Sequence, residues 1–339
     1  MVKNLINNDR LKFLDNVELA DLHAHLGASL SATELWEMAH DQGLQLPTKN
    51  FRAFEQLVSI DDKKDLDEQL LTFDLTEKIQ SSPEAMFYAT QHVISEAYRK
   101  NNITTIELRF NPIFRCQDGA KDMDHILVFA LQGMERAMLK YPVKAGLILM
   151  MDRRLPTEKN EAIVKKAIKY HHRGVVAIDM GGPTGRTKHS REFKPSYIKK
   201  IVQEAKAAGL GLTFHTGEAT DLTEMWAVLR ELQPQRIGHG VRSVDDPQML
   251  DYLREREVVL ELCPQSNIHT KTLADYADIK RVLQQLKKFG VKFTINTDWP
   301  ATLSLSLRQQ IDLLLQHRVL TEAEILASNQ IAQQVTFIK

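Results

Sequence analysis

Eight short apolar or β-branched runs recur along the 339-residue sequence, and longer stretches with helical periodicity separate them. We expect these runs to be strands, at residues 18–26, 103–110, 144–151, 175–180, 211–215, 236–240, 258–263 and 291–296. Strands that alternate with helices pair in parallel through right-handed crossovers. Eight such units predict an α/β fold, a (β/α)8 TIM barrel rather than an open sheet, although six to nine strands would fit almost as well.

The first two runs are too far apart for a single crossover. Residues 31–100 have helical features, including a capping Ser31 and apolar residues at i, i+3 and i+4 between Pro83 and Arg99. We therefore expect a helical insertion over the mouth of the barrel. No internal repeat, low-complexity segment or flexible linker divides the chain, so residues 1–339 are predicted to be one domain.

The charge balance argues against two classes of partner. Lysine plus arginine and aspartate plus glutamate number 44 each, so no bulk attraction to nucleic acid or to an anionic membrane is expected. No apolar run is as long as a membrane-spanning helix, and residues 1–10 lack the apolar core of a signal peptide. Two cysteines, Cys116 and Cys263, do not form a disulfide framework. We expect a cytoplasmic protein, and its oligomeric state stays open.

Histidines and carboxylates gather where the predicted strands end. His23 and His25 are two residues apart in the first strand, so their side chains point to one face. His215 ends the fifth run, His239 lies in the sixth, and Asp298 follows the eighth. The active sites of such barrels lie at the carboxyl ends of the strands. Three histidines and a carboxylate from this set can therefore converge on one zinc ion and leave a position for water.

Each of these residues also has an ordinary structural interpretation. His215 could be a hydrogen-bonded core histidine, and His239, between two glycines, could be a turn residue. Asp298 could cap a helix, and Glu218 could be an acid favoured by a helix N-terminus. The joint placement at strand ends, rather than any single residue, indicates the metal site.

These segments together resemble the adenosine deaminase family of the amidohydrolase superfamily. The matching pieces occur in the family's order and extend over nearly the whole chain: His23–Leu26, Glu107–Pro112, Asp179–Gly182, His215–Glu218, Arg236–Gly240, Cys263–Asn267 and Asn296–Asp298. The resemblance implies a hydrolytic deaminase that converts an adenosine-like 6-aminopurine nucleoside to the 6-oxopurine and ammonia. It also implies a single Zn²⁺ ion bound by His23, His25, His215 and Asp298.

The resemblance further implies roles for the neighbouring residues. Glu218 would protonate purine N1, His239 would orient the attacking water, and Asp298 would contribute to catalysis as well as to metal binding. Gly182 would offer a backbone N–H to purine N3, because a residue without a side chain approaches the ring closely. Residues 175–180 contain no lysine that could be carboxylated to bridge two metals, which favours one ion.

Two substrate contacts of the family are absent from this chain. Gly27 follows Leu26 where the family usually has an aspartate that binds a ribose hydroxyl, and Trp299 replaces the aspartate that bonds purine N7. A site that loses a hydrogen-bonding partner loses discrimination for it. The substrate could therefore be a purine nucleotide or a modified aminopurine, of the AMP, N6-methyl-AMP or adenine type. A catalytically silent purine-binding protein is a further possibility, against which the retained Glu218 and His239 argue.

Basic residues cluster beside the same strand ends. Arg186 lies in a basic segment at residues 183–191, and Arg153 and Arg154 follow the third strand. Such a basic rim could bind a phosphate or carboxylate on the substrate, with Arg186 as the expected contact. The alternative is an ordinary solvated surface. Trp299 could stack on a substrate ring or close the barrel mouth.

Overall fold

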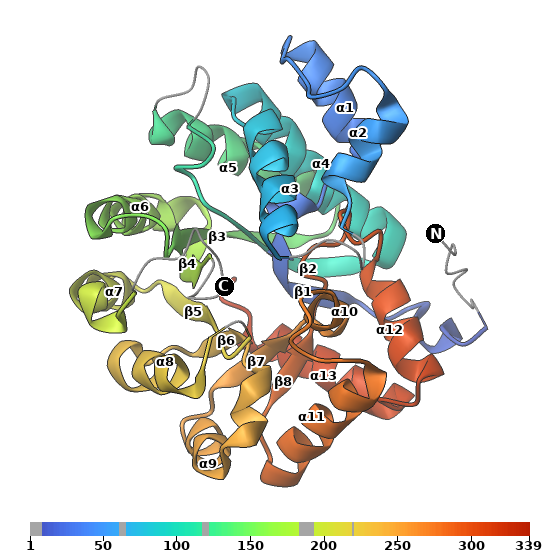
Figure 1. Cartoon of the computed structure of the whole chain (residues 1–339), viewed down its shortest axis with the longest axis vertical. Coiled ribbons are helices and arrows are strands. Elements are labelled where there is room, and N and C mark those ends of the chain that lie inside the picture. The colour runs from blue at the N-terminus through green and yellow to red at the C-terminus, as the bar shows by residue number, and fades with distance from the viewer. Residues whose placement is uncertain (1–8, 61–65, 117–121, 183–192, 219) are drawn as a thin grey trace.

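The computed structural model describes residues 9–60, 66–116, 122–182, 193–218 and 220–339. Eight strands form one parallel sheet in sequence order, and helices surround it (Figure 1). The strands are β1 (Leu19–His25), β2 (Ile103–Phe110), β3 (Lys144–Asp152), β4 (Val175–Gly181), β5 (Gly211–Thr216), β6 (Arg236–His239), β7 (Val259–Leu262) and β8 (Phe293–Ile295). The predicted (β/α)8 TIM barrel is confirmed, and strand bounds differ from the prediction by at most two residues.

Asp298, just after β8, joins the last strand to the first. Its backbone N–H donates to the His23 carbonyl at 2.8 Å, and its own carbonyl accepts from the His25 N–H at 2.8 Å. Ala24 and Asp298 form a parallel bridge at this seam. The backbone contact that closes the barrel therefore also positions the predicted acidic metal ligand.

The strands are buried on both faces, and alternation divides their side chains between two environments. In β2 every residue is buried. Ile106, Leu108 and Phe110 belong to the main hydrophobic core, whereas Glu107 and Arg109 point to the opposite face. The apolar face packs against the surrounding helices and the polar face lines the barrel interior. The interior can therefore hold ionised groups without contact with water.

Capping residues begin most of the outer helices, because a side-chain oxygen satisfies the first free backbone N–H groups. Asp122, Asp221, Asp246, Asp275, Ser306 and Thr321 each accept such bonds. The helices that follow β2 are α5 (Met123–Lys140), α6 (Thr157–Tyr170), α7 (Lys199–Ala207), α8 (Leu222–Ala227), α9 (Pro247–Glu255), α10 (Pro264–His269), α11 (Tyr276–Phe289), α12 (Leu307–Gln316) and α13 (Glu322–Val335). Among the described residues, none of the helices has both the length and the apolar character of a membrane span.

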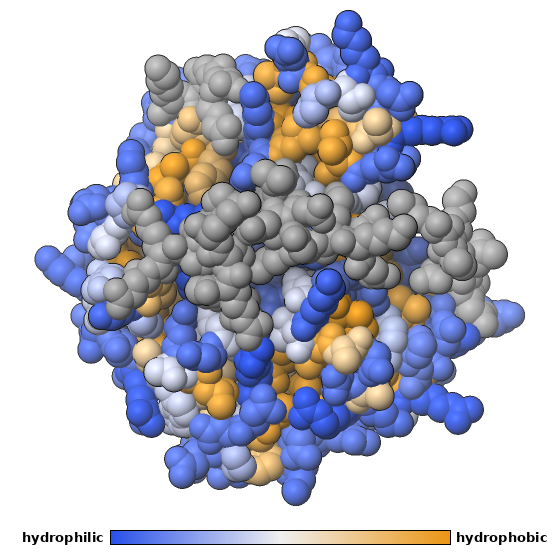
Figure 2. All heavy atoms as spheres, in the orientation of Figure 1, coloured by the Kyte–Doolittle hydropathy of each residue, from blue (hydrophilic) through white to orange (hydrophobic). Residues whose placement is uncertain are grey.

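Four helices lie between β1 and β2: α1 (Ala32–Asp41), α2 (Phe51–Val58), α3 (Leu66–Ile79) and α4 (Pro83–Asn101). Ser31 caps α1 in a capping box with Glu34. Helix α4 packs against α5, α3 approaches the centre of the barrel, and α1 and α2 lie at the periphery (Figure 1). Hydrophilic side chains cover much of the rim of this face, with small hydrophobic patches between them (Figure 2). A single domain with an insertion at residues 31–100 over the mouth stays a prediction.

A cluster of charged side chains links α1 to α4. The His92 ring on α4 pairs with the Glu34 carboxylate on α1, and His92 Nε2 lies 3.7 Å from Glu96 Oε2. Hydrogen bonds with Glu34 and Glu96 raise the pKa of His92 to about 9, although partial burial opposes the shift. The charged imidazole therefore stabilises the contact between the two helices near neutral pH.

We expect this contact to weaken as the pH rises through about 9. A folded-state pKa above the ordinary 6.5 means that the contribution is complete below pH 6.5 and is lost as His92 deprotonates. The three side chains are partly exposed and solvent screens them, so the loss is below about 1 kcal/mol. The midpoint of thermal unfolding should fall more between pH 6.5 and 9.5 in the wild type than in His92→Gln. The exposed His125→Gln variant should behave as the wild type does, and equal falls in all three proteins would contradict the prediction.

Candidate active site

Four predicted ligands converge at the carboxyl ends of the strands. The donor atoms of His23, His25, His215 and Asp298 all lie within 4.8 Å of one another. His25 Nε2 and His215 Nε2 are 3.2 Å apart. Asp298 Oδ1 lies 3.2 Å from His25 Nε2 and 3.5 Å from His23 Nε2. Residues from β1, β5 and the end of β8 thus surround a single point.

Carboxylates hold the other ring nitrogen of two of these histidines. His23 Nδ1 lies 2.7 Å from Glu261 Oε2, and His215 Nδ1 lies 2.9 Å from Asp179 Oδ2. Contacts of this kind fix the ring orientation and leave Nε2 as the ligand atom. His23 Nε2 and both Asp298 carboxylate oxygens are buried without a hydrogen-bond partner among the described residues. Because buried polar atoms are rarely left unpaired, this set of nitrogen and oxygen donors fits Zn²⁺.

The protonation states also suit a metal site. Burial lowers the pKa of His215 to about 3 and holds the pKa of His25 below its ordinary value, so both rings are neutral near pH 7. Burial raises the pKa of Asp298, but the His23 and His25 rings, whose Nε2 atoms lie 3.5 and 3.2 Å from Asp298 Oδ1, outweigh it and keep that pKa well below the usual range. His23 is the exception, because Asp298 and Glu261 raise its pKa against the effect of burial.

A network of buried charges supports the histidines. Arg109 on β2 donates to Asp179 Oδ2 at 2.9 Å and to Glu261 Oε2 at 2.7 Å. Arg236 on β6 donates from Nε to Glu261 Oε1 at 2.6 Å and also pairs with Glu107. All five side chains are at most 1% exposed. No role was expected for this network. Its sequence signals are charge inside otherwise apolar strands and, for all members except Glu261, a place in the segments that resemble the family.

Glu218 and His239 lie next to the cluster. His239 Nε2 is 3.5 Å from Glu218 Oε2 and 3.9 Å from Asp298 Oδ2. Asn267 Nδ2 and Thr270 Oγ1 each donate to Glu218 Oε1 at 3.1 Å, so the carboxylate is held with Oε2 towards His239. Asn267 and Thr270 were not predicted as site residues, and their contribution depends on α10 returning to the barrel mouth.

His239 and Asp298 both have a backbone conformation that residues with side chains rarely adopt. Their φ angles are +62° and +64°. Such residues cost about 1–3 kcal/mol each and persist where the surrounding structure fixes them. Next to His239, a Cβ at Gly238 would lie 2.9 Å from His23 Cε1, so only glycine fits there without displacing the imidazole. The strained positions therefore coincide with predicted catalytic groups.

A second set of possible donors lies beside the first. His239, Cys263 and Asp298 also bring ligand atoms within 4.8 Å of one another. Burial raises the pKa of the Cys263 thiol well above its ordinary value, which disfavours the thiolate that a metal requires. The set that includes three histidines therefore fits a metal better.

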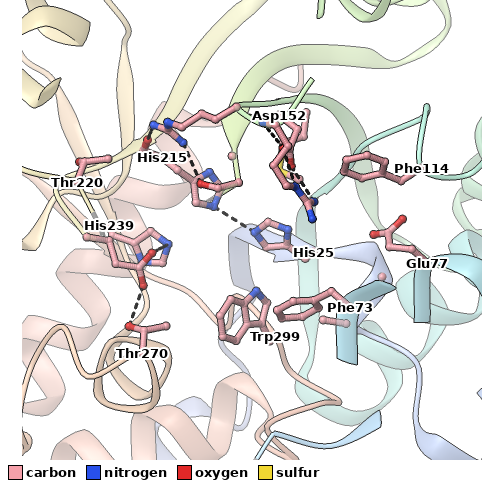
Figure 3. A pocket seen from close by; sticks show the side chains of 18 of the residues that line it. His25, Phe73, Glu77, Phe114, Asp152, His215, Thr220, His239, Thr270 and Trp299 are labelled. Atoms are coloured by element: carbon pink, nitrogen blue, oxygen red, sulfur yellow. Dashed lines mark hydrogen bonds and ion pairs between the residues drawn. The ribbon is translucent and has the colours of Figure 1, made fainter. Parts of the chain in front are cut away.

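A cavity of about 380 Å³ opens over these groups, within the size range of small-molecule sites. His25, His215 and His239 line one part of it (Figure 3). Glu218 lines the same cavity. Aromatic and apolar side chains line another part: Phe73, Phe114, Met150 and Trp299. The ring centroids of Phe73 and Trp299 are 4.7 Å apart. The cavity thus places flat apolar surfaces beside the polar cluster, an arrangement that suits a flat ring with polar edges.

Of the four predicted substrate-binding residues, three line the cavity and one lies outside the described residues. Gly27, Gly182 and Trp299 line the cavity. Gly182 has a φ of +89°, and a Cβ there would lie 2.6 Å from Asp152 Oδ1, so glycine is required on both grounds. Arg186 lies outside the described residues.

The basic rim expected beside the third strand is not a free anion site. Arg153 is buried, and its Nη2 donates to Glu224 Oε1 and to the His215 carbonyl, each at 2.6 Å. Arg154 donates to Asp152 from Nε and Nη2 at 3.0 Å. Both guanidinium groups are therefore already balanced by carboxylates. The sequence could not reveal this for Arg153, because Glu224 lies on α8, far along the chain.

Comparisons with known proteins agree with this geometry. The sequence model of the adenosine deaminase family matches residues 19–339. An adenosine deaminase from Clostridium botulinum is 30% identical over 295 residues, which cover 87% of this chain and 85% of that protein. The structure of the arabidopsis N6-mAMP deaminase superposes with a TM-score of 0.81 at 25% identity, covering 97% of this chain and 96% of the other. An amidohydrolase from Burkholderia ambifaria with bound Zn has the same fold, with a TM-score of 0.86, 19% identity, and coverage of 100% and 90%.

We expect Arg109→Gln to destabilise the protein strongly. The substitution leaves Asp179 and Glu261 buried without their shared cation. Breaking a buried ion pair on one side costs about 3–5 kcal/mol. Chemical denaturation should show a loss of that size in the free energy of unfolding, whereas the exposed Arg136→Gln variant should stay within about 0.5 kcal/mol of the wild type. A loss below about 1 kcal/mol for Arg109→Gln would contradict this view of the network.

Proposed function

Since this chain belongs to the adenosine deaminase family, we propose that it uses one bound Zn²⁺ to deaminate a 6-aminopurine nucleoside, giving the 6-oxopurine and ammonia. The reaction class, hydrolytic removal of an amino group, follows from the family and from deaminases at 30% and 25% identity. The observation that carries the proposal is the buried convergence of four ligand atoms beside an acid and a further histidine.

The residues that would hold the metal are His23, His25, His215 and Asp298. Zinc in such a site supplies Lewis acidity that lowers the pKa of water from about 15.7 to about 7. Two of these histidines are fixed by Glu261 and Asp179, so the donor geometry is set before any ligand arrives.

Glu218 acts on the purine ring. Its Oε1 accepts from Asn267 and Thr270, which leaves Oε2 to deliver a proton to purine N1. Protonation of N1 makes C6 more electrophilic, and water adds to C6 to give a tetrahedral carbon. His239 orients the water, since its Nε2 lies between the Glu218 and Asp298 carboxylates. One water proton passes to His239 as the oxygen bonds to C6, and His239 then gives that proton to N6. The C6 hydroxyl proton returns to Glu218 as the C6–O double bond forms, the C6–N6 bond breaks, and ammonia leaves. The product keeps a proton on N1 and the oxygen on C6.

The remaining contacts hold the ring. The Gly182 backbone N–H is proposed to donate to purine N3, because the absence of a side chain at φ +89° permits close approach. Phe73 and Trp299 offer aromatic surfaces against which the purine packs. The family's acidic contact to N7 is replaced by Trp299, so this edge of the base is recognised differently.

A nucleotide is the second candidate substrate. The similarity to the arabidopsis N6-mAMP deaminase, at 25% identity, favours it. Arg154 and Lys271 also line the cavity, although Arg154 is paired with Asp152. Ammonia release from adenosine, AMP, N6-methyl-AMP and adenine, measured on one preparation with known zinc content, separates the two candidates.

Glu218→Gln is expected to lower kcat by about 10²- to 10⁴-fold, because the amide cannot protonate N1. Zinc content and thermal unfolding should match those of the wild type, since Glu218 is not a proposed ligand. The exposed Glu255→Gln variant is the matched control and should keep full activity. Near-normal turnover by Glu218→Gln would overturn the assigned role.

Metal content should distinguish the two possible donor sets. Elemental analysis of purified protein is expected to give one zinc per chain in the wild type and in Cys263→Ser, and little zinc in His25→Ala. The reason is that His25 belongs only to the first set and Cys263 only to the second. Loss of zinc from Cys263→Ser with retention in His25→Ala would assign the metal to the second set instead.

A further inference from the structure

An ion pair joins α3 to the loop after β2 and reaches the cavity wall. Arg115 Nε lies 2.5 Å from Glu77 Oε2 on α3. The Arg115 side chain is fully buried, whereas Glu77 keeps 16% of its side chain exposed and lines the cavity. Figure 3 shows the Glu77 carboxylate beyond His25, at the opposite end of the cavity from His239.

Gly27 provides the space that this pair occupies. A Cβ at position 27 would lie 2.6 Å from Glu77 Oε1 and 2.9 Å from Arg115 Nη2. The Gly27 carbonyl accepts from Gln80 Nε2 at 3.1 Å, which ties the end of α3 to the loop after β1. A side chain at position 27 would therefore displace the pair. Glu77 can occupy this space because position 27 has no side chain.

The buried Arg115 guanidinium holds the Glu77 carboxylate in place. Among the described residues, Arg115 Nη1 and Nη2 have no hydrogen-bond partner, and Glu77 is the acid paired with this guanidinium. A buried guanidinium is stable only beside a compensating anion, so Glu77 is not free to turn into solvent. One carboxylate oxygen faces Arg115, and the other lies beside Gly27 in the cavity.

We propose that Glu77 is the specificity-determining carboxylate of the site, and that it accepts a hydrogen bond from a sugar hydroxyl of the substrate. This inference rests on the proposed function. It names the substrate class as a 6-aminopurine that carries an uncharged hydroxylated group, and not a phosphate, at this end. The carboxylate comes from the insertion and replaces the acid that the loop after β1 lacks.

The charges near Glu77 favour a hydroxyl over a phosphate. Asp74 and Asp152 line the same cavity. Arg154, the cation closest to them, donates twice to Asp152 and lies 3.7 Å from Asp74. Arg115 is enclosed and does not line the cavity. Among the described residues, the two cations next to these carboxylates, Arg115 and Arg154, are already paired. A phosphate at Glu77 would therefore face carboxylates, whereas a hydroxyl can donate to one.

A set of hydroxyl-deleted substrates tests the contact directly. We would measure kcat/KM for adenosine, 5′-deoxyadenosine and 2′,3′-dideoxyadenosine with the wild type and Glu77→Ala. In the wild type at least one deletion should lower kcat/KM by about 10- to 100-fold, because a carboxylate loses its donor. In Glu77→Ala, kcat/KM for adenosine should be lower than in the wild type by a similar factor. Removing the same hydroxyl from the substrate should then lower kcat/KM little further. The loss should appear mainly in KM.

Two further variants separate recognition from folding. Glu77→Ala leaves Arg115 unpaired, so Glu77→Ala/Arg115→Met, which removes both charges, should show the same loss of discrimination. Glu84→Ala, at an exposed position in the first turn of α4, should keep the wild-type pattern. The wild type should prefer adenosine to AMP. The ratio of the two kcat/KM values should fall at least about 10-fold in the Glu77 variants, since repulsion of the phosphate is removed.

The outcomes are distinct. An unchanged gap between adenosine and every deoxy analogue in both Glu77 variants, with robust turnover, would overturn the role of Glu77 and leave the deaminase intact. A wild-type preference for AMP over adenosine would do the same. Absence of ammonia release from every aminopurine by zinc-loaded wild type would overturn the proposed function, and this inference with it.

Discussion

Arg109 holds two buried carboxylates, Asp179 and Glu261, and each of these holds one histidine of the candidate metal site. Charges taken out of water are stable only when opposite charges and hydrogen bonds replace their hydration. The barrel interior meets this condition by drawing the partners from different strands, β2, β4 and β7. The His23 and His215 rings therefore have a fixed orientation, and the position of the proposed metal ligands depends on the register of the sheet.

Asp298 connects this electrostatic arrangement to the backbone. The same residue closes the barrel between β8 and β1 and offers a buried carboxylate to the ligand cluster. Its left-handed conformation is costly in isolation, but two backbone hydrogen bonds to β1 fix it. The fold and the site are thus stabilised by one feature, and a change that moves the seam would also move the ligand.

The strands could be predicted because their signals are local, and the convergence of the four proposed ligand residues could be predicted because the carboxyl ends of parallel strands meet at one edge. Apolar runs of the right length mark the strands, and His23 and His25 share a face by simple alternation. Contacts between distant segments could not be predicted. Glu261 meets Arg109 only after two strands are placed in register, and Arg153 was expected on the rim but pairs with Glu224 inside. Likewise, the sequence shows that an acid is missing at Gly27, whereas the acid that occupies the space, Glu77, lies in another element.

Helix α3 stands outside the eightfold pattern of strand and helix, yet its Phe73, Asp74 and Glu77 side chains line the cavity. The proposed ligand residues and the α3 residues thus come from different elements, so substitutions in the two places have different effects. Substitutions in the barrel interior disturb the metal ligands, whereas substitutions on one face of α3 change which molecule fits without touching the groups that break bonds. A change in α3 would therefore alter the fit of the substrate and leave the proposed ligand residues at the strand ends in place. Grafting this helix between relatives is a direct route to exchanging their substrate preferences.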